Sequence, residues 1–266
     1  MKWSAVITTY NSGQVVCRAL DSIFALSPAE MPVDVVVVDN SSSDNTVDLI
    51  KSHNMPVKLI LNRRNIGLAK ANNLGALTAS GDSLFFLNPD IELIPGAITE
   101  LSAFQSSNPE AAIIGPCMVD ENGIVQSTAR TWPSPSVIAS RRTPFGKTQW
   151  GRYLSSDHTT RFSSSDEPTE PHWLVGAAMW LTPRGRDRVG LMCEKYFLYF
   201  EDVEWCWRAW KMGMEVWYVP RAKIRHVCHR ESASGGRALR CHLRSMIRFL
   251  TTHPGLMVGA LPGGSK

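Results

Sequence analysis

The stretch VDVVVVDNSSSDNT, residues 33–46, indicates the fold class of this 266-residue chain more directly than any other. Its first part, Val33–Val38, is almost continuously apolar, as is typical of a strand buried on both faces of a parallel sheet. The polar part begins at Asp39 and leads into a helical pattern at Thr46–His53, preceded by Ser, Asp and Asn residues that are candidate N-caps. A buried strand joined to a helix by a polar turn predicts one unit of an α/β sheet.

The same alternation of strand and helix runs through the first half of the chain. Strand patterns are found at Trp3–Thr8, Val57–Leu61, Ser83–Leu87 and Ala112–Gly115. Helical spacing of apolar residues is found at Gly13–Leu26, Leu68–Ala79 and Pro95–Phe104. Strands that alternate with helices predict an α/β fold with a mostly parallel central sheet, in which ligands bind at the carboxyl ends of the strands.

The second half has a different pattern, and we find no internal repeat in the chain. Asp120–Gly123 is a turn signal that predicts a hairpin. Thr131–Pro171 is rich in Pro, Ser, Thr and Arg with little periodicity, so we interpret it as a long mobile segment. Beyond it, strands are predicted at His172–Leu181 and Val216–Val219, and helices at Asp202–Gly213 and Ala238–Thr251.

The composition excludes wholesale disorder. Apolar residues make up 44% and charged residues 20% of the chain, as in an ordinary globular protein. The longest apolar runs are far too short to cross a bilayer, and we see no secretory signal at the N-terminus. The six cysteines have no paired spacing, which favours reduced thiols and a cytoplasmic location.

Charge is distributed unevenly along the chain. Residues from Arg221 onward include nine Lys or Arg and one acid, whereas the preceding 220 residues include 19 basic and 23 acidic residues. A basic tail predicts an anionic neighbour: a membrane surface, a pyrophosphate-bearing acceptor or nucleic acid. Arg237, Arg240, Arg244 and Arg248 share one helical face, which predicts peripheral contact with the anionic inner face of the plasma membrane. The alternative is a helix that packs its apolar face on the core and leaves these arginines in solvent.

Polar residues follow several of the predicted strands. Asp39 can accept hydrogen bonds from a nucleobase or ribose, or it can belong to a plain strand–turn–helix junction. Gly67 lets the backbone approach a ligand closely. Asn72 and Asn73 have a low propensity for a helix interior, which indicates a role other than forming the helix. The alternative is that this segment only allows close packing of the helix on the sheet. Asp90 can hold Mg²⁺ or Mn²⁺, which prefer oxygen ligands, although Asn-Pro-Asp is also a common turn.

Two groups in the second half have the residue types of a reactive site. Glu201, Asp202 and Glu204 begin a predicted helix, where they can supply a general base, although the helix dipole favours carboxylates there in any case. His226 belongs to a cysteine and histidine group whose spacing lacks the paired units of a zinc site. The other members of this group are Cys228, His229, Cys241 and His242.

As an ordered set, these segments resemble the family 2 glycosyltransferases with a GT-A fold, particularly the bacterial rhamnosyltransferase-like branch. The resemblance covers about residues 1–234. It rests on Val6–Asn11, Val37–Asp44, Asn65–Gly67, Asn72–Gly75, Leu87–Asp90, Gly176–Ala177, Tyr199–Glu204 with Arg208 and Gly213, Val219–Pro220 and His226.

The resemblance implies a role for each matching position. Asp202 would be the catalytic base with Glu201 beside it, and Asp90 and His226 would be metal ligands. Trp173–Ala177 would form part of the acceptor wall. The nucleotide sugar would lie near Thr8, Tyr10, Asn11, Asp39, Asn65, Gly67, Asn72 and Asn88, of which Asp39 would contact the base.

The chain departs from the family pattern at two places. Asn88 stands where the family has the first acid of its Asp-x-Asp element, which leaves Asp90 as the carboxylate there. Gly190–Glu194 stands where the family often has Gly-Gly-Phe-Asp-Glu, in a region that shapes the acceptor pocket.

The resemblance therefore implies an inverting glycosyltransferase that depends on Mg²⁺ or Mn²⁺. It would move one sugar from a nucleoside diphosphate sugar, dTDP-rhamnose or a UDP-sugar, to a hydroxyl of a glycan or lipid-linked acceptor in cell-surface polysaccharide synthesis. We expect one GT-A domain at residues 1–234, with nucleotide-sugar binding in 1–115 and the acceptor and catalytic residues in 116–234. A C-terminal basic helix and tail would occupy residues 235–266.

Three other classes of protein compete with this interpretation. A non-catalytic nucleotide-sugar binding protein of the same fold would keep Asp39 but would not need Glu201 and Asp202. A nucleotidyltransferase would need a basic, glycine-rich phosphate loop after the first strand, where Thr8–Gly13 has no Lys or Arg. A nucleic-acid binder would need a base-reading motif beside the arginines, and we expect no nucleic-acid partner because none accompanies them.

Overall fold

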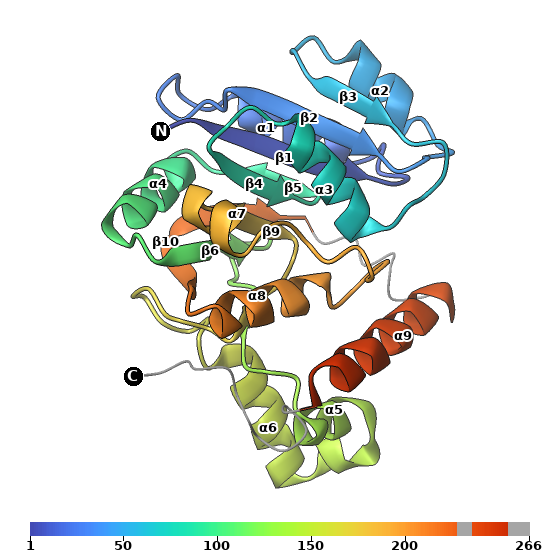
Figure 1. Cartoon of the computed structure of the whole chain (residues 1–266), viewed down its shortest axis with the longest axis vertical. Coiled ribbons are helices and arrows are strands. Elements are labelled where there is room, and N and C mark those ends of the chain that lie inside the picture. Colours follow the sequence, from blue (N-terminus) through green and yellow to red (C-terminus); the bar gives the residue numbers. More distant parts are fainter. Residues whose placement is uncertain (228–235, 255–266) are drawn as a thin grey trace.

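The computed structural model describes residues 1–227 and 236–254 and has a mixed sheet at its centre (Figure 1). The strands of this sheet are β1 Trp3–Thr9, β2 Asp34–Asp39, β3 Lys58–Leu61, β4 Ser83–Leu87, β5 Ile91–Leu93, β6 Ala111–Val119, β9 Ala178–Leu181 and β10 Glu215–His226. Within the described ranges the sheet has eight strands in the order β3-β2-β1-β4-β9-β6-β10-β5. Two short strands, β7 Ala129–Arg130 and β8 Trp173–Leu174, pair antiparallel in a separate small sheet.

Helices cover both faces of the central sheet. The helices in the described ranges are α1 Val16–Phe24, α2 Thr46–Ser52, α3 Leu68–Thr78, α4 Ala97–Ser107, α5 Pro135–Arg142, α6 Gln149–Thr160, α7 Pro183–Arg188, α8 Glu201–Lys211 and α9 Gly236–Thr252, with a 3-10 helix, η1, at Pro144–Lys147. Of these, α5, η1 and α6 lie away from the central sheet (Figure 1). Because side chains alternate along a strand, Val6 of β1 packs in a cluster with α3 and α8. Ala5 and Ile7 pack on the other face, in a cluster with α1, α2 and α4.

The topology places the ends of three strands together. β1 lies between β2 and β4 and is parallel to both, so the order of the strands reverses at β1. In α/β sheets such a reversal leaves a crevice at the carboxyl ends of the strands. The register pairs Thr9 with Asp39 and Ile7 with Leu87, so the polar residues that follow these strands emerge at one edge. The prediction of a mostly parallel sheet flanked by helices is confirmed.

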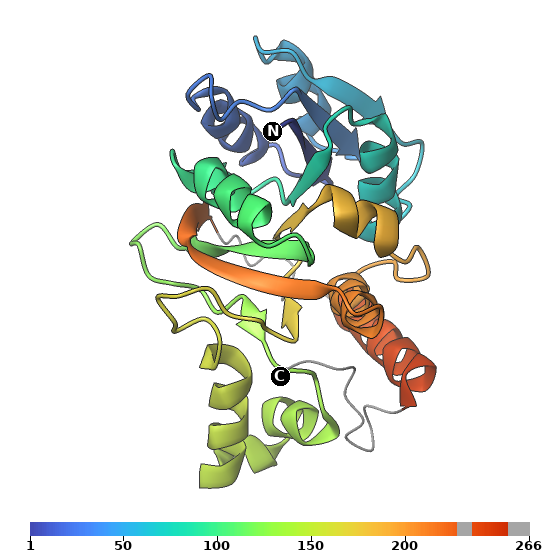
Figure 2. The ribbon, with the colours of Figure 1, turned by 60° about the vertical axis from the view of Figure 1, so that its left-hand side comes forward.

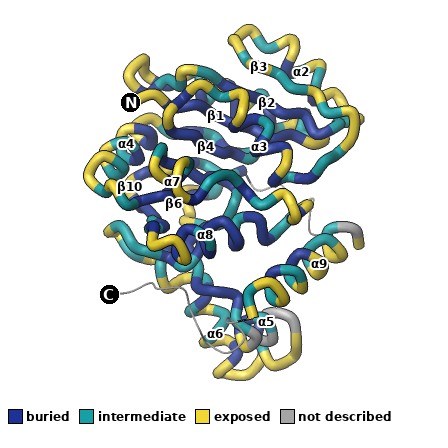
Figure 3. Tube along the Cα trace, in the orientation of Figure 1, coloured by how far each residue is buried: buried dark blue, intermediate teal, exposed yellow. Residues whose placement is uncertain are grey.

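The hydrophobic core extends across both halves of the chain. One cluster joins Val6 and Phe86 of the first half to Trp205, Tyr218 and Phe249 of the second. The strands at the centre and most of α8 are buried, whereas α9 has a mixed surface (Figure 3). The division of the chain at residues 115 and 234 stays a prediction.

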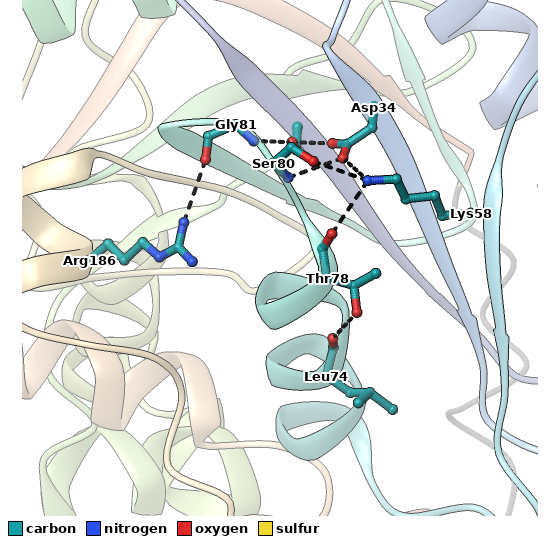
Figure 4. A network of polar contacts seen from close by, with 8 residues as sticks. Asp34, Lys58, Leu74, Thr78, Ser80, Gly81 and Arg186 are labelled. Carbon is teal, nitrogen blue, oxygen red and sulfur yellow. Dashed lines mark hydrogen bonds and ion pairs between the residues drawn. The ribbon is translucent and has the colours of Figure 1, made fainter.

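A polar network fastens the edge of the sheet opposite the crevice (Figure 4). Asp34, at the start of β2, accepts hydrogen bonds from Lys58 Nζ (2.6 Å) and from Ser80 N (3.0 Å). Ser4 Oγ donates to the same carboxylate and accepts from Gly81 N (2.7 Å). The network ties β1, β2 and β3 to the turn that follows α3, and so holds α3 in place along the sheet.

The predicted long mobile segment at Thr131–Pro171 is wrong, because the structure places α5, η1 and α6 in it. Its Ser and Thr residues act as helix caps instead of loop formers. Ser134 Oγ accepts from Val137 N (3.3 Å) at the start of α5, and Thr148 Oγ1 accepts from Gly151 N (3.0 Å) at the start of α6. The weak apolar periodicity of the segment concealed these helices.

Three other predictions differ in their details. The strand predicted at His172–Leu181 is interrupted, since β8 pairs with β7 while β9 enters the central sheet. β10 runs on to His226 through an irregularity near Pro220, which adds pairings with β5. The turn at Asp120–Gly123 is present, but its hairpin amounts to a single bridge. None of the helices in the described ranges is long and apolar enough to span a membrane.

Candidate active site

The loops after β1 and β2 are bound to each other. Asn11 Oδ1 accepts from Ser43 N (2.8 Å), and Thr46 Oγ1 accepts from Ser12 N (2.8 Å). Asn11 and Ser41 both have left-handed backbone conformations, with φ of 52° and 71°, which non-glycine residues adopt only where surrounding contacts hold them. The Tyr10 side chain, by contrast, is 46% exposed. A rigid turn thus presents a free aromatic ring at the edge of the crevice.

Asp39 is the buried acid at this edge, with 2% of its surface exposed. Its carboxylate accepts from Thr9 Oγ1 (3.1 Å) and from Ser42 N (2.9 Å). These bonds fix the carboxylate at the end of β2 and shape the loop that begins there. Contact with a nucleobase stays a prediction for Asp39.

Asn65 and Gly67 form the start of α3. Asn65 Oδ1 accepts from Asn40 Nδ2 (3.0 Å) and from Gly67 N (3.0 Å). Gly67 has φ of 90°, and a Cβ atom there would lie 2.6 Å from Phe197 O. Since Leu68 N also donates to Phe197 O (2.8 Å), the segment before α8 lies directly on the beginning of α3. Only glycine permits this close approach.

Thr8, Asn72 and Asn73 connect β1 and α3 to the segment at residues 189–194. Thr8 Oγ1 donates to Asn72 Oδ1 (2.7 Å), and Asn73 exchanges hydrogen bonds with the backbone N and O of Met192. The two Asn side chains are 4% and 6% exposed. These buried hydrogen bonds explain why two asparagines occur inside a helix. A direct role of Thr8 and Asn72 in ligand binding stays a prediction. The 189–194 segment, where the family pattern is broken, is thus held between α3 and α8.

Asp90 and His226 meet at the edge of the sheet. Asn88 and Asp90 lie in the turn between β4 and β5, closed by a bond from Ile91 N to Asn88 O (3.2 Å). β5 pairs antiparallel with β10, and His226 stands opposite Ile91. This pairing places Asp90 Oδ2 3.4 Å from His226 Nε2, with both side chains more than four-fifths buried. Glu92, two residues further, is instead paired with Arg18 and Arg225.

The tautomer of His226 suits a cation between these two side chains. Gln126 Nε2 donates to His226 O (3.1 Å), so Gln126 Oε1 is the atom that faces the ring, 2.6 Å from Nδ1. Nδ1 therefore donates, and a neutral ring presents its Nε2 lone pair to the Asp90 carboxylate. Within the described ranges, Asp90 Oδ1 is a buried atom without a hydrogen-bond partner. His226 Nε2 and the Asp90 carboxylate, with its unpartnered Oδ1, form a set of acceptors that fits a divalent cation. Metal-binding histidines are usually oriented by a hydrogen bond from their other ring nitrogen, as His226 is by Gln126.

The other described members of the cysteine and histidine group lie on a different element from His226. Cys228 and His229 lie outside the described residues. Cys241 and His242 belong to α9, where the His242 ring lies 5.3 Å from that of Tyr199. In the part of the chain that the structure describes, no three His, Cys, Asp or Glu side chains form a potential metal cluster.

Asp202 stands at the start of α8, next to a strained turn. Tyr199 and Phe200 before it both have φ of 67°. Gly176 N and Val203 N each donate to the Asp202 carboxylate at 2.9 Å. Gly176 comes from the segment between β8 and β9, so these bonds join the acceptor wall implied by the resemblance to the predicted base. Strain of this kind gathers at functional sites.

Glu201 and Asp202 are adjacent carboxyl groups at the start of α8. Burial raises the pKa of Glu201 well above its ordinary value, and the charge of Asp202 adds to the rise. Glu201 is 4% exposed, and its Oε2 has no partner among the residues described. Burial also raises the pKa of Asp202, but the two N–H donors and the charge of Arg130 oppose the rise. Asp202 is therefore the carboxylate that ionises first, which suits a general base.

Arg130 is a site residue that the sequence did not reveal. The pairing of β7 with β8 sets Arg130 opposite Trp173, and its guanidinium lies 5.3 Å from the centre of that ring. Its Nη2 also donates to Ser127 O (3.2 Å). Gln126 was missed in the same way, because both residues lie between predicted elements and reach the site through long-range pairing.

Arg130→Met should shift the acid limb of the pH–rate profile. The base must be ionised, so the rate falls as pH falls below its pKa, and loss of the Arg130 charge raises that pKa further. We expect the limb to move to higher pH. Arg161→Met is the matched control, since Arg161 lies over the Phe162 ring in a similar contact. A limb that stays in place in Arg130→Met, or that moves equally in both variants, contradicts this role.

The sheet, its crevice and the acids at its edge define an α/β glycosyltransferase. Residues 4–166 match the family model described as glycosyl transferase family 2, and the chain belongs to this family. It is 29% identical over 259 residues to the N-acetylglucosaminyl-diphospho-decaprenol L-rhamnosyltransferase of Mycobacterium tuberculosis, covering 92% of this chain and 82% of that protein. It is 28% identical over 229 residues to the dTDP-rhamnosyl transferase RfbF of Shigella flexneri, covering 84% of this chain and 68% of that protein.

Solved structures confirm the GT-A fold. The crystal structure of GalNAc-T7 with UDP, GalNAc and Mn²⁺ superposes with a TM-score of 0.68 at 20% identity, and this chain spans about half (48%) of that chain. Staphylococcus aureus TarS 1–349 in complex with UDP superposes with a TM-score of 0.58 at 16% identity. The matches cover 94% and 98% of this chain, respectively. The rhamnosyltransferase-like resemblance is thus confirmed by sequence and the fold by structure.

Proposed function

We propose that this protein transfers one sugar, with inversion, from a nucleoside diphosphate sugar to a hydroxyl of a lipid-linked acceptor in cell-surface polysaccharide synthesis. dTDP-rhamnose is the favoured donor and a UDP-sugar the second choice. The observation that carries the proposal is the Asp202 carboxylate, held by two N–H donors at the edge of the crevice. The names of the two rhamnosyltransferase relatives support the donor, and that of the mycobacterial relative supports a diphospholipid acceptor.

The donor would lie across the ends of β1, β2 and β4. The exposed Tyr10 ring offers a surface on which a base can stack, and Asn11 and Asp39 line the same edge. Asn65, Gly67 and Asn72 would lie near the ribose and diphosphate, and Asn88 would also line the nucleotide-sugar site, as the family resemblance implies. Thr8 and Asn72 are proposed to support this part of the crevice from below, since their side chains bond to each other.

Asp90 and His226 would hold Mg²⁺ or Mn²⁺ together with the donor diphosphate. Two protein ligands are few, but such cations commonly complete their shell with water and substrate phosphates. When bound, the cation would neutralise the negative charge that grows on the leaving diphosphate. Gln126 orients His226 so that Nε2, rather than Nδ1, faces the cation.

Asp202 would take the proton from the acceptor hydroxyl as that oxygen attacks the anomeric carbon. The bond from the anomeric carbon to the diphosphate breaks as the new glycosidic bond forms, so a single displacement inverts the configuration. A β-linked donor such as dTDP-L-rhamnose would give an α-linked product. Burial raises the pKa of Glu201, which favours its neutral form beside the base.

A donor panel tests this proposal. The purified protein is given UDP-, dTDP- and GDP-sugars with a short-chain GlcNAc-diphospholipid, in Mn²⁺, Mg²⁺ or EDTA, and the released nucleoside diphosphate is measured. We expect release from dTDP-rhamnose that EDTA abolishes. Calorimetric binding of a donor without turnover on any acceptor favours the non-catalytic nucleotide-sugar binding protein instead. Absence of both binding and turnover contradicts the proposal.

We also place the reaction in the cytoplasm, at the inner face of the plasma membrane, with α9 contacting the lipid. α9 attaches to the body through buried Phe249 and a bond from Ser245 Oγ to Leu198 O (2.9 Å). Leu239, Leu243 and Ile247 remain 50%, 41% and 58% exposed. Arg240 and Arg244 are exposed beside them, whereas the Arg237 side chain lies outside the described residues. Exposed aliphatic residues flanked by arginines are typical of helices that lie on anionic membranes.

A further inference from the structure

A shallow cavity, open to solvent, lies within the helical segment α5–η1–α6, away from the candidate active site. It has a volume of about 510 Å³. Its lining consists of Ser140, Thr143, Gly146, Lys147, Arg152, Ser155, Ser156 and Thr159. Five hydroxyl groups and two cationic side chains face one space that no carboxylate lines. Ser140 Oγ and Thr159 Oγ1 already donate to backbone carbonyls. The two cationic side chains and the hydroxyls of Ser155 and Ser156 are donors that match the oxygens of a phosphate group.

The charge of the surrounding segment points to the same ligand. Between Glu121 and Asp157 the chain has five basic residues and no acidic one. Arg152 Nη1 donates to Lys147 O (2.7 Å), which holds the guanidinium close to the Lys147 backbone. Within residues 1–227 and 236–254, neither Lys147 nor Arg152 forms an ion pair with a carboxylate. The positive potential at the cavity is therefore not neutralised within this segment.

Several aromatic residues are interspersed in the sequence with the residues that line the cavity, and their side chains are exposed to solvent. Trp150 and Tyr153 are 63% and 60% exposed, and their rings lie 5.8 Å apart. Phe145 of η1 is 36% exposed. Three large exposed aromatic residues within nine positions are unusual on a water-facing surface, whereas Trp and Tyr are enriched where proteins meet the interface of a bilayer.

The position of the segment fits a lipid surface. α5 and α6 form the end of the molecule remote from β1–β3, and α9 extends in the same lower half (Figures 1 and 2). α6 is anchored to the body through buried His158 and a bond from Ser127 Oγ to Thr159 O. Just before α5 in the chain, β7 carries Arg130, whose charge opposes the rise in the pKa of Asp202. A bilayer touching α6 would thus lie on the acceptor side of the protein.

We propose that α5–η1–α6 is a binding site for an anionic phospholipid. The cavity takes the phosphate of the headgroup, with Lys147 and Arg152 as its charge partners. Trp150 and Tyr153 enter the interfacial layer of the bilayer beside it. The choice of a membrane lipid rests on the proposed function, which puts the acceptor in a membrane, but its test needs no turnover.

Vesicle flotation tests the site. Phosphatidylcholine vesicles with and without 30% phosphatidylglycerol serve as probes, and the proposal expects wild-type protein to float with the anionic vesicles. Lys147→Gln/Arg152→Gln should weaken binding about 30-fold, since each charge near an anionic surface contributes about 1 kcal/mol. Trp150→Ala/Tyr153→Ala should weaken binding to both compositions. Leu243→Ser/Ile247→Ser measures the contribution of α9 separately.

The controls distinguish vesicle binding at this site from the general effects of surface charge and surface hydrophobicity. Lys51→Gln on α2 and Leu77→Ala on α3 remove an exposed charge and an exposed apolar side chain elsewhere, and should bind as wild type. Inorganic phosphate should displace the protein from vesicles more than chloride at equal ionic strength, because it competes for the cavity. Donor turnover on a soluble acceptor should be unchanged in every variant.

Three outcomes overturn the proposal. The first is equal binding of wild type and Lys147→Gln/Arg152→Gln. The second is the same displacement by phosphate and by chloride, which shows surface charge without a site. The third is binding of a single-stranded oligonucleotide that these variants lose while vesicles are ignored, because stacked aromatic residues and cations also bind nucleic acid.

Discussion

Asp202→Asn should lower kcat by about 10²–10⁴-fold, the usual size of a general-base contribution. The amide keeps the shape of the carboxyl group and can still accept from Gly176 N, so α8 and the acceptor wall should stay in place. It cannot take a proton from the acceptor hydroxyl. Calorimetric binding of the donor should therefore match that of the wild type, while nucleoside diphosphate release with acceptor falls.

Two companion variants sharpen this result. Asp48→Asn changes an exposed aspartate in the first turn of α2 and should leave kcat within twofold, or about 0.4 kcal/mol. Glu201→Gln replaces a carboxyl whose pKa burial raises, so its effect should be much smaller than that of Asp202→Asn. Retention of activity within threefold in Asp202→Asn would sink the assignment of Asp202 as base. A larger loss in Glu201→Gln would transfer the role to Glu201.

Asp90→Asn should raise the Mn²⁺ concentration needed for half-maximal activity by more than 100-fold. The carboxylate supplies the one negative charge among the two proposed protein ligands, and its Oδ1 has no other partner in the described structure. His226→Ala should act in the same direction. Gln126→Ala should lower the affinity for Mn²⁺ by about 10–100-fold, because it removes the hydrogen bond that fixes the His226 tautomer.

A direct binding measurement keeps this prediction independent of turnover. Mn²⁺ bound in the presence of nucleoside diphosphate is measured by electron paramagnetic resonance for each variant. Glu92→Gln is the matched control, since Glu92 lies two residues from Asp90 but forms ion pairs with Arg18 and Arg225. An unchanged Mn²⁺ titration in Asp90→Asn, or an equal shift in Glu92→Gln, would refute the Asp90–His226 site.

Local sequence patterns predicted the first half of the fold closely. β4 has the bounds that the apolar run Ser83–Leu87 indicated, and α3 ends one residue before the predicted limit of Leu68–Ala79. β4 is fully buried and α3 is buried along one face, so the period of their buried residues follows the period of their backbone. The helices of Thr131–Pro171 were missed for the opposite reason. Their exposed faces carry aromatic residues and their caps carry Ser and Thr, so their periodicity is weak.

In the candidate site, too, some residues are identified by local sequence patterns, whereas the role of others depends on long-range contacts. Asp202 and Asp90 stand out in the sequence because an acid at an element boundary is locally visible. The role of Asn73 is not, since its side chain holds Met192, which is 119 positions away. Asn72 likewise bonds to Thr8, 64 positions away. Whether a polar residue binds a ligand or another part of the chain depends on what the fold brings beside it.

Local patterns along the chain are sufficient to predict the alternation of strand and helix, the parallel half of the sheet and the acids at its edge. These features depend on neighbours a few residues apart, which share one period of hydrophobicity. Only the tertiary structure brought His226 to Asp90 through the pairing of β10 with β5, and Arg130 to the Asp202 side through the pairing of β7 with β8. Strand pairing is set by burial across the whole sheet, so no local pattern encodes it.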